Sequence, residues 1–261
     1  MPAIFYVPIF SVALASYFIY KKKRKKEIIV PEHWHNILIE HVLFYTKLNK
    51  KEQPIFRYRM AEFLNDTTIE GVEIQLEEKD HIYIAASAII PIFGFKGWKY
   101  PNLHTVLIYP DYFNENLQFC ENSENKNIAG FVGTGRFENH MVLSKRALDH
   151  GFENKTDKKN TAIHEFVHLL DMLDGTIDGI PDKLFNYEYE TSLAWLNLMH
   201  NKMEAINNKK SDIRNYGGTS KTEFFAVASE YFFERPDLLK RKHPDLYQML
   251  SKCFNQTLYS N

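Results

Sequence analysis

At residues 161–171 the chain reads Thr161-Ala-Ile-His164-Glu165-Phe-Val-His168-Leu-Leu-Asp171. Its apolar residues predict a buried helix, expected over 156–172. Histidines four residues apart lie one above the other on a single helical face, so both imidazoles can bind one metal ion. Glu165 then lies beside the open side of that metal and can take a proton from a metal-bound water. The pattern predicts a zinc hydrolase, most often a peptidase.

The alternative is an ordinary core helix whose two histidines only hydrogen-bond to their neighbours. Such a helix would still need partners for His164, Glu165 and His168, because unpaired buried polar groups cost several kcal/mol. The motif alone therefore leaves both interpretations open, and the choice depends on a third metal ligand elsewhere in the chain.

Catalytic zinc takes three protein ligands and leaves one position for water. One class of zinc peptidases uses a third His ten residues after the first, but that position holds Asp174 here. In a later apolar segment, Glu223 and Glu230 fall seven residues apart on one helical face. Two carboxylates on a buried helix need cations or donors nearby, and a zinc ion at His164 and His168 would meet that need with Glu223 as the third ligand. Alternatively, Glu223 caps the helix N-terminus, where negative charge is also favourable.

Length and composition limit the possible classes. The 261 residues include 44% hydrophobic and 15% aromatic side chains, enough for a substantial core. The formal net charge of −1 argues against direct nucleic-acid binding, which usually needs a basic surface. Two cysteines, Cys120 and Cys253, form no disulfide framework and have no metal-ligand spacing.

The N-terminus has a composition of its own. Residues 1–20 carry no charged side chain, and six basic residues follow at 21–26. About 20 apolar residues suffice to cross a bilayer, and basic flanks favour the cytoplasmic side. We therefore expect residues 1–26 to be a single-pass anchor in the inner (cytoplasmic) membrane, with a catalytic domain over 27–261 facing the cytoplasm. The alternative is a cleaved signal peptide ending near Ala13-Leu-Ala15.

Hydrophobic periodicity predicts an α+β fold that is mainly helical and contains a small β-sheet. The expected strands are 71–77, 104–109, 130–135 and 141–144. The expected helices, besides the motif helix, are 31–48, 50–65, 82–92, 187–208, 221–233 and 244–257. The glycine-rich strand at 130–135 could border the cleft and pair with an extended substrate.

Taken together, the motif around His164, the later segment Glu223-Phe-Phe-Ala-Val-Ala-Ser-Glu230 and the stretch His104-Thr-Val-Leu-Ile-Tyr-Pro resemble the Mlc titration factor A (MtfA) family of zinc metallopeptidases. The resemblance covers about residues 30–258. It implies a zincin-type domain with aminopeptidase-type activity on small substrates, similar to the catalytic domain of anthrax lethal factor.

By the same resemblance, Zn²⁺ is held by His164, His168 and Glu223, and Glu165 is the general base. Tyr216, seven residues before the third ligand, matches a tyrosine that could donate a hydrogen bond to the oxyanion. Candidates for orienting the ligating imidazoles are Asp171, Asp174 and Glu230.

The resemblance also implies a partner, because the family binds a glucose-responsive transcriptional repressor. The expected partners are therefore a peptide or protein substrate, with that repressor as a candidate, and the membrane through the N-terminal helix. Two rival functions remain. One is a non-catalytic protein that sequesters a regulatory protein. The other is a membrane scaffold with vestigial catalysis, against which the intact Glu165 argues.

Overall fold

The computed structural model describes residues 28–119, 127–133, 135–154 and 157–258. The helices are α2 (Trp34–His41), α3 (Leu43–Lys47), α4 (Glu52–Asp66), α5 (Glu78–Ile92), α6 (Lys145–Glu153), α7 (Thr161–Asp171), α8 (Tyr189–Asn207), α9 (Lys221–Glu234), α10 (Pro236–Lys242) and α11 (Pro244–Phe254). Three short 3-10 turns are η1 (Gly135–Phe137), η2 (Met172–Asp174) and η3 (Asn215–Gly218). The strands are β1 (Thr68–Gly71), β2 (Thr105–Tyr109), β3 (Gly130–Val132) and β4 (His140–Ser144).

The four strands form one mixed sheet in the order β1-β2-β4-β3. The first three strands in this order run parallel, while β3 pairs antiparallel with β4, with Gly130 opposite Leu143. Within the described residues β3 therefore forms one end of the sheet. Helix α7 packs against both β3 and β4, so this end of the sheet lies beside the motif helix.

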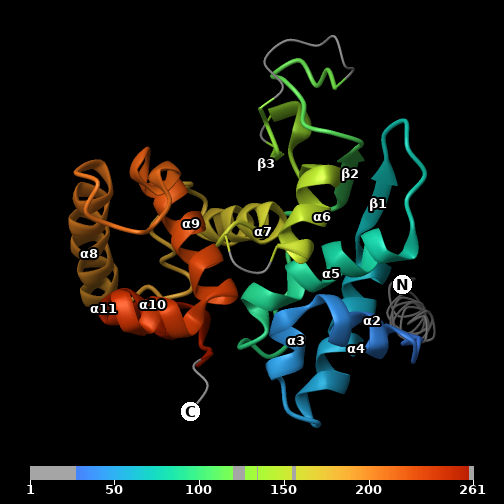
Figure 1. The fold of residues 1–261 in the computed structure, drawn as a ribbon, viewed down its shortest axis with the longest axis horizontal. Coiled ribbons are helices and arrows are strands. Elements are labelled where there is room, and N and C mark those ends of the chain that lie inside the picture. The colour runs from blue at the N-terminus through green and yellow to red at the C-terminus, as the bar shows by residue number, and fades with distance from the viewer. Residues whose placement is uncertain (1–27, 120–126, 134, 155–156, 259–261) are drawn as a thin grey trace, which may run out of the picture.

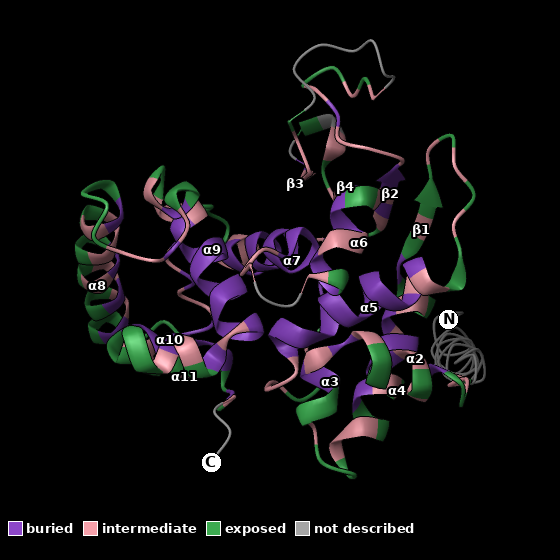
Figure 2. Cartoon of the chain, in the orientation of Figure 1, coloured by how far each residue is buried: buried purple, intermediate pink, exposed green. Residues whose placement is uncertain are grey.

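Helix α7 is the centre of the molecule (Figure 1), with the strands above it in this view, α5 below and α9 to one side. Every residue of α7 is buried, as are Phe224 to Glu234 of α9. Figure 2 shows the contrast with α8, whose outward faces are exposed. Polar side chains on α7 and α9 thus lie within the core rather than on the surface.

The structure confirms a mainly helical chain with a small sheet, and corrects several boundaries. The predicted helix 31–48 breaks at Val42, whose backbone is extended. The prediction of a strand over 71–77 is wrong. The strand in this region, β1, ends at Gly71, because the left-handed backbone of Glu73 turns the chain away. The motif helix begins at Thr161 rather than 156. Helices α6 and α10 were not expected.

The expected membrane localisation is corrected. Among the described residues, no helix has the length and apolar character needed to span a membrane. The segment expected to do so, residues 1–26, lies outside the described part of the chain.

Candidate metal centre

Helix α7 begins at a defined cap. The side chain of Asn160 accepts a hydrogen bond from the backbone N–H of Ile163 at 3.1 Å, which satisfies one of the free donors of the first turn. From this start, the four-residue spacing places His164 and His168 on the same face. Their rings lie 4.6 Å apart, edge to face.

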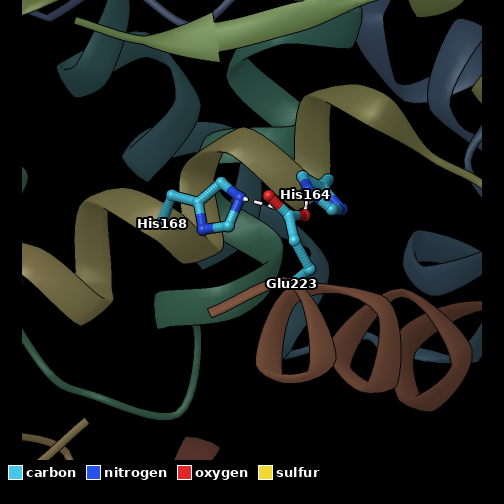
Figure 3. Close-up of side chains that lie close together, drawn as sticks. All are labelled: His164, His168 and Glu223. Carbon is cyan, nitrogen blue, oxygen red and sulfur yellow. Dashed lines mark hydrogen bonds and ion pairs between the residues drawn. The ribbon is translucent and has the colours of Figure 1, made fainter. Parts of the chain in front are cut away.

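Helix α9 supplies the facing carboxylate. Its N-cap is Ser220, whose hydroxyl accepts a hydrogen bond from the backbone N–H of Glu223 at 3.1 Å. Because Ser220 caps the helix, the Glu223 side chain is free to point across to α7, as Figure 3 shows. Its Oε2 atom lies 3.0 Å from Nε2 of His164 and 3.7 Å from Nε2 of His168. Both distances favour the ligand interpretation over helix capping.

The three side chains fit a tetrahedral metal site. One ligand atom from each of His164, His168 and Glu223 lies within 4.8 Å of the others. Ligands about 2.1 Å from zinc in a tetrahedron are roughly 3.4 Å from one another. Two imidazole nitrogens and one carboxylate oxygen also form a donor set that zinc prefers. The residues present therefore suit a zinc ion that keeps a position for water.

The charges at the centre also favour a cation. Burial would raise the pKa of Glu223, but the two imidazoles hold it far below its ordinary value, so the carboxylate is ionised at neutral pH. Burial lowers the pKa of His164, yet the carboxylates of Glu230 and Glu223 outweigh it and raise that pKa to about 10. The positive charge that these carboxylates favour is the one a metal ion would provide.

Glu230 orients the first histidine. Its Oε1 lies 2.7 Å from Nδ1 of His164, and its Oε2 accepts a hydrogen bond from the backbone N–H of Asn160 at 2.5 Å. The guanidinium of Arg214 also pairs with this carboxylate. With Nδ1–H held by Glu230, Nε2 of His164 is the nitrogen on the Glu223 side, and a metal ion there would take the place of its proton.

Asp171 and Asp174, the other two candidates for orienting the imidazoles, serve the loop after α7. Asp171 accepts a hydrogen bond from the backbone N–H of Gly179 at 2.9 Å. Burial raises the pKa of Asp171 to about 7. Asp174 bonds the backbone and hydroxyl of Thr176 in a local turn. Among the described residues, Nδ1 of His168 has no hydrogen-bond partner, so neither aspartate holds it as Glu230 holds His164.

Gly179 lies between the end of α7 and the start of α9, the two helices that carry the metal-site residues. Its backbone carbonyl accepts a hydrogen bond from the indole of Trp195 at 2.7 Å, while its N–H bonds Asp171 at the end of α7. A Cβ at Gly179 would overlap the carbonyl oxygen of Lys221, at the start of α9. The residue also has a left-handed backbone, with φ of +76°. Glycine is therefore required here for both space and conformation.

Glu165 faces β3 across a cleft. A Cβ at Gly130 would lie only 3.1 Å from Oε1 of Glu165, so the absence of a side chain at Gly130 leaves room for this carboxylate. The cleft beside them has a volume of about 450 Å³ and is also lined by His164 and Tyr216. Burial raises the pKa of Glu165, while the two histidines oppose the shift. A buried carboxyl with a raised pKa is suited to exchanging protons.

Tyr216 lines the cleft beside the metal site. Its ring stacks near that of His164, with centroids 6.0 Å apart, and the side chain is half exposed. Burial and the negative charge of Glu223 raise the pKa of Tyr216 to about 12, so the hydroxyl keeps its proton at neutral pH. The hydroxyl remains a hydrogen-bond donor, and in this structure its partner is Glu223.

Sequence reasoning missed three residues of the centre. Arg214 and Asn160 both bond Glu230, and Lys159 lines the cleft. Asn160 carried a readable signal, since an Asn directly before a helical pattern often caps it. No spacing rule could have joined Arg214 to Glu230, because the contact depends on how η3 packs against α9.

The model of the family described as glucose-regulated metallo-peptidase M90 matches residues 18–255. This chain belongs to that family. Among similar proteins, an uncharacterised protein of Synechocystis sp. (slr2042) is 28% identical, over 88% of this chain and 87% of its own length.

Two further relatives are called Mlc titration factor A. The protein from Pectobacterium atrosepticum is 28% identical, over 86% of each chain. The protein from Serratia proteamaculans is 25% identical, over 85% of this chain and 86% of its own. The resemblance to the MtfA family is thereby confirmed, and membership in M90 assigns the chain to the metallopeptidases.

Proposed function

We propose that this chain is a zinc-dependent peptidase whose metal ligands are His164, His168 and Glu223. The convergence of these side chains beside a cleft large enough for a peptide segment carries the proposal. Three protein ligands leave a coordination position for water, as in catalytic zinc sites, whereas structural sites are closed by four. A buried Glu165 beside the ligands supports catalysis as well, because a purely structural site has no need of a base.

Each residue around the metal site has a separate role in the proposed hydrolysis. When bound, zinc would supply a Lewis acid that lowers the pKa of water and polarises the scissile carbonyl. Glu165 takes the proton from the attacking water and passes it to the leaving amine. The Tyr216 hydroxyl donates a hydrogen bond to the oxyanion. Glu230 keeps the His164 ring in the orientation that binds metal.

Strand β3 would hold the substrate's main chain. One edge of β3 bonds β4: the carbonyl of Ala129 accepts from the N–H of Ser144, and the N–H of Gly133 donates to the carbonyl of His140. Backbone groups alternate in direction along a strand, so those of Gly130 and Val132 point to the other edge. An extended peptide can add to that edge by main-chain hydrogen bonds. This arrangement would place a peptide bond of the substrate next to Glu165.

The family resemblance supports an exopeptidase of the aminopeptidase type, and we propose that mode of cleavage. The name Mlc titration factor A, borne by two of the relatives, makes a transcriptional repressor a candidate for the protein that this peptidase regulates. The alternative is a non-catalytic protein that sequesters such a regulator, and hydrolysis measurements separate the two.

The test compares the full-length protein with Glu165→Gln and, as a matched control, Glu204→Gln on the exposed face of α8. Zinc content is measured by mass spectrometry, and hydrolysis with a library of dipeptides and longer peptides. We expect about one zinc per chain in all three proteins, with cleavage by the wild type and Glu204→Gln only. Zinc binding without cleavage by the wild type would favour sequestration. Failure of the wild type to bind added zinc would contradict the proposal.

A further inference from the structure

The cleft extends from the metal centre in one direction. It runs past His164 and Thr161 at the start of α7, and His168 is not among its lining residues. The opposite wall is the stretch 127–130, which leads into β3. Lys159, just ahead of α7, lines the same cleft and is half-buried.

Among the described residues, Lys159 is the cation lining the cleft that has no partner, since Arg214 pairs with Glu230. Glu230 is only 1% exposed and is already engaged by Arg214, Asn160 and His164. Within the part of the chain that the structure describes, the Lys159 ammonium makes no hydrogen bond or ion pair. A half-buried ammonium next to a cleft gains most from an anionic ligand. In a peptide, that anion is a carboxylate.

The direction of the substrate follows from β3. Antiparallel strand pairing is more frequent than parallel pairing. In an antiparallel pair, the substrate residues after the scissile bond lie opposite the residues that precede Gly130. Pairing cannot extend far on that side, because Ile128 already exchanges hydrogen bonds of 3.1 and 3.0 Å with Phe113. An extended substrate would therefore leave the strand edge soon after the scissile bond, within the cleft that Lys159 lines.

We propose that Lys159 binds a carboxylate on the residue that follows the scissile bond. The carboxylate is either the C-terminal carboxylate or that of an aspartate or glutamate side chain. The substrates would then be short peptides with a negative charge on the leaving residue. This inference rests on the proposed peptidase function, from which a binding measurement separates it.

The experiment uses full-length, zinc-loaded Glu165→Gln protein, in which bound peptides are not cleaved. Three dipeptides differ only in their leaving residue: Leu-Asn-amide has no carboxylate, Leu-Asp-amide has one on the side chain, and Leu-Asn has one at the C-terminus. Affinities are measured by calorimetry. We expect one of the two charged peptides to bind about tenfold more tightly than Leu-Asn-amide, as for a charge-assisted hydrogen bond. The charged peptide whose affinity exceeds that of Leu-Asn-amide shows whether the bound carboxylate is on the side chain or at the C-terminus.

Variants of Lys159 then test the assignment. Lys159→Met in the same background should reduce the affinity ratio of charged to neutral peptide to about one, and Lys159→Arg should keep most of it. Lys50→Met, which removes an exposed lysine between α3 and α4, should leave the ratio unchanged. A ratio near one in the parent protein, no measurable binding of any peptide, or a preference that survives Lys159→Met would overturn the inference.

Hydrolysis of the same peptides by the wild type separates the two proposals. Cleavage of all three with equal kcat/KM would leave the peptidase standing and remove the role of Lys159. A Lys159-dependent preference in binding, together with no cleavage of any peptide, would leave the carboxylate site standing and remove the peptidase.

Discussion

Glu230 lies 2.7 Å from Nδ1 of His164, although the two residues are 66 positions apart in the chain. The contact fixes which ring nitrogen of His164 faces the metal site, because a nitrogen that donates to a carboxylate leaves the other as the ligand. The position of the first metal ligand therefore depends on the packing of α9 as well as on α7.

Replacement of Glu230 by glutamine should weaken zinc binding about 10- to 100-fold, as is usual when a partner of a ligating histidine is changed. An amide accepts a weaker hydrogen bond and favours the required tautomer less. Competition with a chelator of known affinity measures the effect. Glu234→Gln, one turn further along α9, is the control and should change zinc affinity less than about threefold. Equal losses in the two variants would contradict the assigned role of Glu230.

Gly130→Ala should lower activity while zinc remains bound. The new methyl group would lie 3.1 Å from Oε1 of Glu165 and 2.8 Å from Leu143, so either the carboxylate or the strand must move. A displaced general base costs up to the 10²- to 10⁴-fold that such a group contributes, and we expect a loss of about tenfold or more. Metal content and kcat/KM are measured together. Unchanged kcat/KM would show that Glu165 does not work at the position seen here.

Gly179→Ala should cost more stability than Gly97→Ala, although the two glycines have nearly the same φ, +76° and +75°. Alanine in this conformation costs about 1 to 2 kcal/mol by itself. At Gly97 nothing lies within 4 Å of the added carbon, whereas at Gly179 it overlaps the backbone of Lys221. Urea unfolding gives the difference. Gly179→Ala should also weaken zinc binding. Equal free energies of unfolding in the two variants would contradict the close approach of Gly179 to the backbone of Lys221.

Glu234 makes stability depend on pH. Burial, with the neighbouring charge of Glu230, raises the pKa of Glu234 from 4.5 to about 9. The unfolded chain releases this proton near pH 4.5, whereas the folded protein holds it to about pH 9. The folded state thus binds more protons in that window, and its stability falls as pH rises through it. Glu234→Gln should stabilise the protein by about 2 kcal/mol at pH 9 and by much less at pH 4.5. Urea unfolding with chelator present tests this, and an equal effect at both pH values would contradict it.

Metal removal should leave the fold intact. The ligand-bearing helices α7 and α9 pack directly against each other, and Glu230 of α9 bonds Asn160 and His164 without help from an ion. Chelated protein should therefore keep its near-ultraviolet circular dichroism and unfold cooperatively. Free zinc at a thousand times its Kd should add about 4 kcal/mol to the free energy of unfolding. A chelated protein without cooperative unfolding would mean that the metal organises the site.

The sequence predicted the elements whose pattern is local. The motif helix, α9, β2 and β4 follow from periodicity, and the pairing of the two histidines from their spacing. Glu223 could be proposed because a buried carboxylate on an apolar helix needs a cation. The ligand roles of these residues remain predictions, while their convergence is now a structural observation.

What the sequence could not predict depends on tertiary packing. Residues 72–77 alternate as a strand would, but the turn at Glu73 takes them out of the sheet. The pairing of Arg214 with Glu230 and the place of Lys159 in the cleft join segments that no periodicity links. The N-terminal anchor was predicted from composition alone, and nothing in the described residues supports it.

The packing of α7 against α9 without an ion has a consequence, under the proposed function, for when the protein becomes active. A chain whose ligands are positioned by its own backbone can finish synthesis and folding before it meets an ion, with little further ordering left for the binding step. In cells short of zinc, the protein would accumulate as a folded and inactive reserve. Restored zinc supply would then switch on the reserve without new translation, so the response would be as fast as metal uptake.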